Sequence, residues 1–550
     1  MLNTNKFIPN ILYANSSKIM EFQNPMVNYH PQNHDQYYQD TIPSYIEIRE
    51  FNLEENKQKI AEYIRKLLST STNNNLDDYE KDEIVKKLLS KFPTKAYIVS
   101  TDNIRMLITQ YDRVKSELSS AGNNISNLKP GSLLYYAIST AYSIEKNNLR
   151  WFNNIKEDLF KERIDVDILG SNSYKDFVEN ASYDPISRKI AFGTFISYKD
   201  KKVYNATQDT DIVIHELGHA ILDHLRPSYM DNIFDLESQA IHEAFSDINA
   251  FLHAAMDRNI KVKPEDLDRP NPISSIAEYL GSIFNTQNKI KKEILENDFL
   301  ADLEKISDNK PIRELSQIKE YKPYSKLIEK IPHSYSLALS TTFYRAFTYY
   351  AKEIGDVHKA AEEFFKVFAM GTKISPVASS TMPEFYKSII IADIIYNGSK
   401  LSKYLIKAAN ESKLLNTSIE QIQNEITNSK SLDVSEIKQE IQKAKNVNVI
   451  ELYKKLEKSL LNFLKANFPE FSLVKDIKVN IYPGINNHLN LEATYVYPVD
   501  LKYDNKSVVI YGGVLLVFDD NLNLVYSHIE KLSIEKVAKM KDYMARNIIF

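Results

Sequence analysis

The stretch TDIVIHELGHAILDH, Thr210 to His224, places two histidines and a glutamate inside an otherwise apolar segment. Its apolar residues recur at helical spacing, and positions i and i+4 of a helix lie on one face. His215 and His219 can therefore bind one metal ion together. Glu216 lies about 100° further round the helix, close enough to act on a water at that metal. Two buried histidines without partners would be costly, which favours a metal site over a structural role.

A catalytic zinc ion takes three protein ligands and keeps a fourth position open. Three residues downstream are candidates for the third ligand. His224 lies at an awkward angle to the face of the two histidines. The segment ESQAIHEAFSD, Glu237 to Asp247, is predicted to be a second helix with Glu243 and Asp247 on one face. It therefore offers a carboxylate ligand with a second carboxylate beside it, and Glu237 as an alternative ligand.

Together, HELGH and HEAFSD resemble the thermolysin-type gluzincin zinc metallopeptidases, whose pattern is HExxH followed by ExxxD on a second helix. The resemblance implies that His215, His219 and Glu243 hold one Zn²⁺ per chain. It implies that Glu216 is the general base and that Asp247 orients a zinc-bound imidazole. Segments similar to the family follow in the family's order over roughly residues 131–399.

The resemblance also assigns residues to the substrate and the reaction intermediate: Asn180, Ala181, Ile212, Tyr229, Arg313 and His333. Asn180 and Ala181 match an edge strand that binds the substrate backbone. Arg313 matches an arginine that grips a substrate carbonyl, and His333 and Tyr229 match groups that hold the oxyanion. Outside the resemblance, Arg313 suits a surface ion pair, His333 a helix start and Asn180 a turn.

The sequence departs from the family at several positions. His242 precedes the third ligand, where asparagine is usual, so a different environment is expected around His219. Asp211 matches a calcium ligand, but Ala254 stands where the double calcium site needs an acid. Calcium binding there is doubtful, and Asp211 can instead cap the helix. An insertion over about residues 261–310 precedes Arg313.

Composition limits the partners. The chain has 550 residues, a formal net charge of −4 and no cysteine. It therefore has no overall basic field for nucleic acid, no disulfides and no cysteine nucleophile. The longest apolar stretch, SIIIADIIY, is shorter than the roughly 20 residues of a membrane span. A soluble protein is therefore expected, and no Sec signal peptide is evident. The resemblance favours an extracellular location or leaderless export, with a cytoplasmic location left open.

The pattern of helices and strands predicts an α+β protein with five regions. They are a flexible arm (1–44), a mainly helical N-terminal region (45–130), a two-lobed thermolysin-like domain with a mixed sheet and a helical lobe (131–412), a helical connector (413–470) and a small α+β domain (471–550). Helices are expected at Asp78–Leu89 and Asp102–Leu118, with a strand at Thr94–Ser100. The C-terminal strands should be closed by a helix over Ser533–Asn547.

These residues predict a zinc-dependent endopeptidase that acts on a peptide or protein, and no segment indicates an aminopeptidase. Two alternatives stay open. One is a non-catalytic binding protein on a peptidase fold, against which Glu216 and Asp247 speak. The other is a leaderless toxin or effector protease with one protein target, which fits the long regions outside the resemblance. The sequence does not identify the substrate, the oligomeric state or any activating cleavage.

Overall fold

The computed structural model describes residues 20–22, 46–52, 61, 65, 78–89, 95–168, 181–231, 235–277, 311–443, 449–503 and 506–547, with short gaps inside some of these ranges. Two compact units divide the chain. The first comprises residues 1–149, 160–217 and 277–312, and the second comprises residues 150–159, 218–276 and 313–550. Each unit is described by itself.

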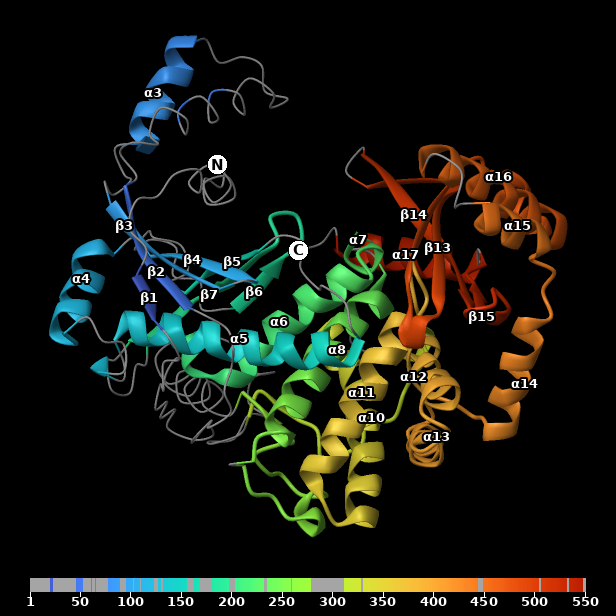
Figure 1. The fold of residues 1–550 in the computed structure, drawn as a ribbon, viewed down its shortest axis with the longest axis horizontal. Helices are drawn as coiled ribbons and strands as arrows, with labels where there is room; N and C mark the ends of the chain where they lie inside the picture. Colours follow the sequence, from blue (N-terminus) through green and yellow to red (C-terminus); the bar gives the residue numbers. More distant parts are fainter. Residues whose placement is uncertain are drawn as a thin grey trace. The chain divides into compact units, whose positions relative to one another are not determined.

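A seven-stranded mixed sheet forms the first unit, in the order β1-β2-β3-β4-β5-β7-β6 (Figure 1). Its strands are β1 (Met20–Phe22), β2 (Ile46–Asn52), β3 (Lys95–Ser100), β4 (Ile104–Ile108), β5 (Ile164–Asp167), β6 (Ala181–Asp184) and β7 (Lys189–Phe192). Neighbouring strands are antiparallel except β4–β5 and β5–β7, which are parallel. The helices of this part are α3 (Asp78–Leu89), α4 (Tyr111–Ser120) and α5 (Leu133–Ile155), and β8 (Thr194–Ile196) pairs with β9 (Val203–Asn205).

The N-terminal region contains more sheet than expected. It supplies β2, β3 and β4, so its description as mainly helical is incomplete. The predicted helix over Asp102–Leu118 is wrong in its first half, because Ile104, Met106 and Ile108 alternate with less buried neighbours in β4. Helix α4 follows only from Tyr111. The predicted flexible arm lies outside the described residues except for β1.

Helices dominate the second unit. They include α7 (Ser228–Asp231), α8 (Leu236–Ala255), α10 (Pro332–Ile354), α11 (Val357–Lys373), α12 (Met382–Tyr396) and α13 (Ser402–Glu411), together with the second half of α6 (Thr210–Leu225). Aromatic packing fixes α8 at the centre. The ring centroid of Phe245 lies 4.7 Å from that of Phe368 on α11, and the Phe251 ring contacts Phe343 and Phe347 on α10. Helix α8 is therefore held by the core of this unit.

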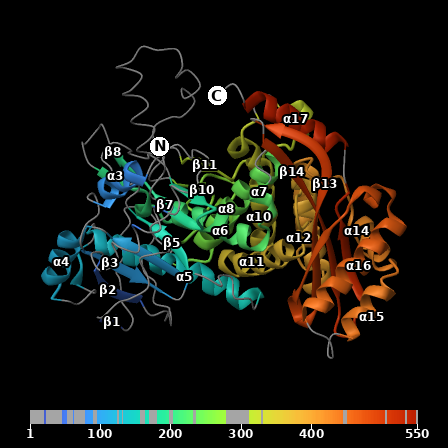
Figure 2. The same cartoon turned by 90° about the horizontal axis from the view of Figure 1, so that it is seen from above.

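The C-terminal part of the second unit is a four-stranded antiparallel sheet with helices. Its strands are β12 (Ile477–Pro483), β13 (Leu489–Tyr503), β14 (Lys506–Phe518) and β15 (Leu524–Ile529), in sequential order. Its helices are α14 (Ile419–Lys430), α15 (Ser435–Lys443), α16 (Val449–Asn467) and α17 (Ile534–Asn547). Figure 2 shows β13 and β14 between α12 on one side and α14, α15 and α16 on the other.

This sheet is joined to the helices by a buried ion pair. Arg226 follows the last residue of α6 and is 1% exposed. Its Nη1 lies 2.9 Å from Glu492 Oε1 on β13, and its Nη2 donates to the carbonyl oxygens of Lys373 and Ser375. The C-terminal strands thus share a compact unit with the helices.

The mixed α+β class predicted from the sequence is confirmed. The closing helix is also present as α17, and the strand at Thr94–Ser100 appears as β3. Within the described part of the chain, no helix is both long and apolar enough to cross a bilayer.

Candidate metal centre

Two helices, α6 and α8, carry the predicted metal ligands. Asp209, just before α6, accepts a hydrogen bond at Oδ1 from the backbone N–H of Asp211 (3.2 Å), and its carbonyl accepts from Val213 N–H. Asp209 therefore caps α6, and the expectation that Asp211 does so is wrong. Asp211 Oδ2 instead accepts from the N–H of Ala277. Helix α8 is capped by Asp235, whose Oδ1 accepts from Glu237 N–H.

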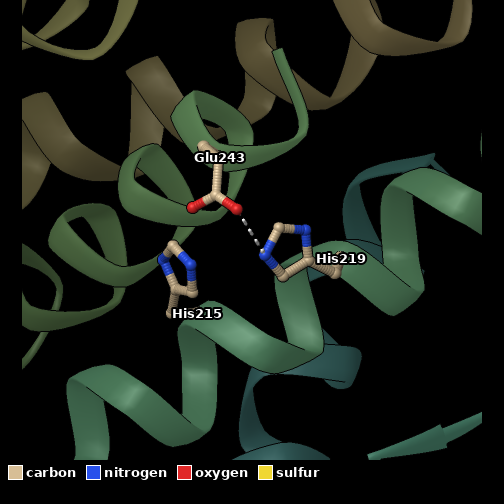
Figure 3. Close-up of side chains that lie close together, drawn as sticks. All are labelled: His215, His219 and Glu243. Carbon is tan, nitrogen blue, oxygen red and sulfur yellow. Dashed lines mark ion pairs between the residues drawn. The ribbon is translucent and has the colours of Figure 1, made fainter. Parts of the chain in front are cut away.

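The three predicted ligands come together. Donor atoms of His215, His219 and Glu243 all lie within 4.8 Å of one another. The two imidazoles lie one turn apart on α6, and the Glu243 carboxylate points toward them from α8 (Figure 3). His219 Nε2 is 3.7 Å from Glu243 Oε1. No other such group of three is found among the described residues, and neither His224 nor Glu237 belongs to this one.

The donor set and spacing fit a small divalent cation such as Zn²⁺. Nitrogen and oxygen ligands at about 2.1 Å in a tetrahedron lie about 3.4 Å from one another. The distance between His219 Nε2 and Glu243 Oε1 is close to that value. Two imidazoles and one carboxylate are also a ligand set that catalytic zinc uses. The site can hold one metal ion, and the spacing alone does not identify the element.

The carboxylate of Glu243 is placed where a metal ion can reach it. Every residue of α8 is buried except Gln239 and Glu243. Its Oε1 faces His219, and its Oε2 accepts a hydrogen bond from Arg313 Nη2 at 2.9 Å and lies 3.3 Å from His333 Nε2. Oε2 is thus held by Arg313, while Oε1 faces His219. This arrangement leaves Oε1 available to a metal ion beside His219.

Arg313 connects the predicted ligand Glu243 to Asp247, the second carboxylate on the same face of α8. It lies in β11 (Arg313–Glu314), which pairs with β10 (Ser275–Ile276). Its Nη1 donates to Oδ1 of Asp247, whose side chain is fully buried. Because a buried carboxylate needs a compensating charge, Arg313 stabilises Asp247 as well as Glu243. The roles predicted for Arg313 toward a substrate and for Asp247 toward an imidazole remain predictions.

His242 contacts the predicted ligand His219 at Nδ1, the ring nitrogen that does not face Glu243. The Nδ1 atoms of the two rings are 3.5 Å apart, and the rings are nearly parallel at 21° with centroids 5.7 Å apart. Burial lowers the pKa of His242 well below its usual value, so the ring is neutral. The ring of Tyr229 packs edge-on against it.

The remaining predicted residues are His333, Tyr229, Ile212, Ala181 and Asn180. His333 is the second residue of α10, and its side chain is 60% exposed beside Glu243. Tyr229 is fully buried and donates its hydroxyl to the Pro376 carbonyl (2.7 Å), a partner that the oxyanion role did not predict. Ile212 lies on α6 one turn before His215, and Ala181 begins the edge strand β6. Asn180 lies outside the described residues.

The chain matches no protein-family model and no curated protein sequence. The assignment of the site therefore depends on its own geometry. Sequence reasoning did not anticipate the bridge from Arg313 to Glu243 and Asp247, which joins residues more than 60 positions apart. The sequence linked His242 to the environment of His219, and the structure adds the contact between their Nδ1 atoms.

Proposed function

We propose that this protein is a zinc-dependent endopeptidase. The observation that carries the proposal is the convergence of His215, His219 and Glu243 within 4.8 Å, with Glu216 on the same helix as the two histidines. Glu216 is 7% exposed, so its carboxylate is largely removed from bulk water. In the HExxH pattern on a helix, the glutamate beside the two metal-binding histidines acts as the general base of hydrolysis.

Zn²⁺ bound at the three ligands supplies a Lewis acid that polarises the scissile carbonyl and acidifies a water molecule. The Glu216 carboxylate takes the proton of the attacking water and delivers it to the amide nitrogen of the departing amine. The exposed His333 side chain, whose Nε2 lies 3.3 Å from Glu243 Oε2, turns its Nε2–H from that oxygen to the oxyanion as it develops. Arg313 keeps Glu243 and Asp247 in place while the charge shifts.

The test separates metal binding from chemistry. Purified protein should bind about one Zn²⁺ per chain and digest a peptide library internally, with activity lost on chelation. Glu216→Gln should keep the metal and lose about 10²–10⁴-fold in kcat, because only the proton transfer is removed. Glu243→Gln should weaken zinc binding as well.

Two outcomes would contradict the proposal. One is a folded wild-type protein that takes up no zinc. The other is a Glu216→Gln variant that hydrolyses peptides at the wild-type rate. Zinc binding without hydrolysis of any peptide in the library would favour the non-catalytic binding protein. Cleavage confined to a single protein would favour a dedicated effector protease.

A further inference from the structure

A cavity of about 430 Å³ lies within the second unit, and none of the predicted metal ligands lines it. It is found where the N-termini of α8 and α12 meet the segment that runs from the end of β15 into α17. Its volume is within the range of about 300–1,000 Å³ that is typical of small-molecule sites. Four carboxyl groups line the cavity, those of Asp235, Glu237, Glu384 and Glu530.

Two of these carboxyls are held only by neutral groups. Glu237 is 6% exposed, and it accepts hydrogen bonds from the Tyr321 hydroxyl (3.4 Å) and from the first backbone N–H of α12 (2.9 Å). Glu530 accepts from two backbone N–H groups just before α12 (2.8 and 3.1 Å) and from the Ser379 hydroxyl. Within the described part of the chain, neither carboxyl forms an ion pair. A carboxylate withdrawn from water without a counter-charge is costly, so both would gain from a cation in the cavity.

Two lysines that line the cavity are directed to other carboxylates. Lys536 donates to the Ser379 hydroxyl and lies 3.5 Å from Asp235 Oδ2. Lys531 lies 3.8 Å from Glu470 Oε1, which is not part of the cavity wall. The lysines therefore do not supply the direct counter-charge that the two neutrally held carboxyls lack.

The pKa values of the two carboxyls agree with this imbalance. Burial raises the pKa of Glu237 and of Glu530 to about 7, and repulsion from Glu384 raises both further. Lys539 acts on Glu237, and Lys536 on Glu530, in the opposite direction without cancelling the effect of burial. Both carboxyls are therefore about half protonated near pH 7, and a cation bound beside them would displace their protons.

We propose that this cavity is a binding site for a small molecule with a primary ammonium group on an aliphatic stem, held by the carboxylates of Glu237 and Glu530. A carboxylate has about four acceptor positions, and the hydrogen bonds above use two in Glu237 and three in Glu530, so each can still accept from an ammonium group. Leu236, Ile529 and Met540 give the stem an apolar wall. Metal binding and peptide hydrolysis play no part in this inference.

Calorimetry on the full chain with n-butylammonium as the probe tests the proposal. 1-Butanol has the same stem without the charge and should bind at least about 10-fold more weakly. Glu237→Gln and Glu530→Gln should each lower the affinity for n-butylammonium by about 10–100-fold, the loss expected for a hydrogen bond to a charged group. The matched control is Glu425→Gln, which makes the same change of charge at an exposed ion pair on α14 and should bind like the wild type.

Norleucine has the same stem with a carboxylate beside the ammonium group, so it distinguishes the two sources of this chemistry. Tighter binding than n-butylammonium indicates a free amino acid as the ligand, and weaker binding indicates a simple alkylamine.

The affinity should also rise with pH, because protons compete with the ligand. The ionised fraction of a carboxyl with a pKa of about 7 rises about 30-fold between pH 5.5 and 8, and the affinity for n-butylammonium should rise by at least a similar factor. If the glutamine variants do not fold, proton release decides: the wild type should release about 0.5–1 proton on binding at pH 7, measured by calorimetry in two buffers. Absence of binding, equal binding of 1-butanol, or binding without proton release would overturn the inference and leave the proposed function standing.

Discussion

Gly218 lies where α6 packs closely against α8, and replacing it with alanine should damage the proposed metal site. A Cβ at this position would lie 2.7 Å from the Cα of Ser246 on α8. Because the obstacle is backbone, no side-chain rotation relieves it. Reaching the 3.4 Å at which ordinary contact begins requires the helices to separate by about 0.7 Å. Metal sites tolerate deviations of only about 0.2 Å in ligand distance.

Gly218→Ala should therefore lower zinc affinity by about 10–100-fold, the loss typical of misplaced ligands. The matched control is Gly371→Ala, because a Cβ there would lie 2.5 Å from the Cα of Ile389 and so separate α11 from α12, which carry no proposed ligand. Both variants suffer overpacking of about 1–3 kcal/mol, offset by about 1 kcal/mol of helix propensity. Chelator competition and thermal melting measure the two effects. Wild-type zinc affinity in a folded Gly218→Ala protein would refute the reasoning.

Four further outcomes are expected. His333→Ala should lower kcat and kcat/KM together by about 10²–10³-fold with unchanged zinc content, and wild-type kcat would return His333 to a structural role. Burial raises the pKa of Glu237 to about 7, so the folded state binds more protons than the unfolded state, and stability should fall by about 3 kcal/mol from pH 4.5 to 7. In the Glu237→Gln variant, the urea midpoint should change less between pH 4.5 and 7 than in the wild type. An unchanged slope would exclude the Glu237 carboxyl as the source of the pH dependence. Glu492→Gln should lower the urea midpoint by the equivalent of about 3–5 kcal/mol, because Arg226 would stay buried without a counter-charge; an unchanged midpoint would contradict this. Removing zinc should lower the thermal midpoint, because zinc at 100 times its Kd adds about 2.7 kcal/mol to the free energy of unfolding. A thermal midpoint that does not change with zinc would argue against a native metal site.

Local periodicity predicted the elements that depend on local sequence. The helix over Asp78–Leu89 and the closing helix near the C-terminus are present as α3 and α17. The helix predicted over Asp102–Leu118 is wrong at Ile104–Ile108, where burial alternates every second residue in β4. Its two-residue alternation was visible in the sequence, but its parallel pairing with β5 joins Ile104 to Ile164 and has no local signal.

The metal ligands could be predicted because helical geometry places His215 and His219 on one face. Choosing Glu243 over Glu237 required the family resemblance, and the structure agrees with that choice. The bridge made by Arg313 depends on how a short strand pair is placed against α8, which is set by tertiary packing. No pattern within either segment encodes such a contact.

The buried Arg226 has a consequence for how this chain can change during evolution. Its guanidinium is attached to the end of the helix that carries both histidines, and its counter-charge, Glu492, lies in a strand 266 positions later. A descendant that lost the C-terminal strands by truncation or recombination would keep a buried cation beside its metal-binding helix. Loss of the strands should therefore be accompanied by replacement of Arg226. Among relatives, arginine at position 226 and an acid at position 492 should be inherited together.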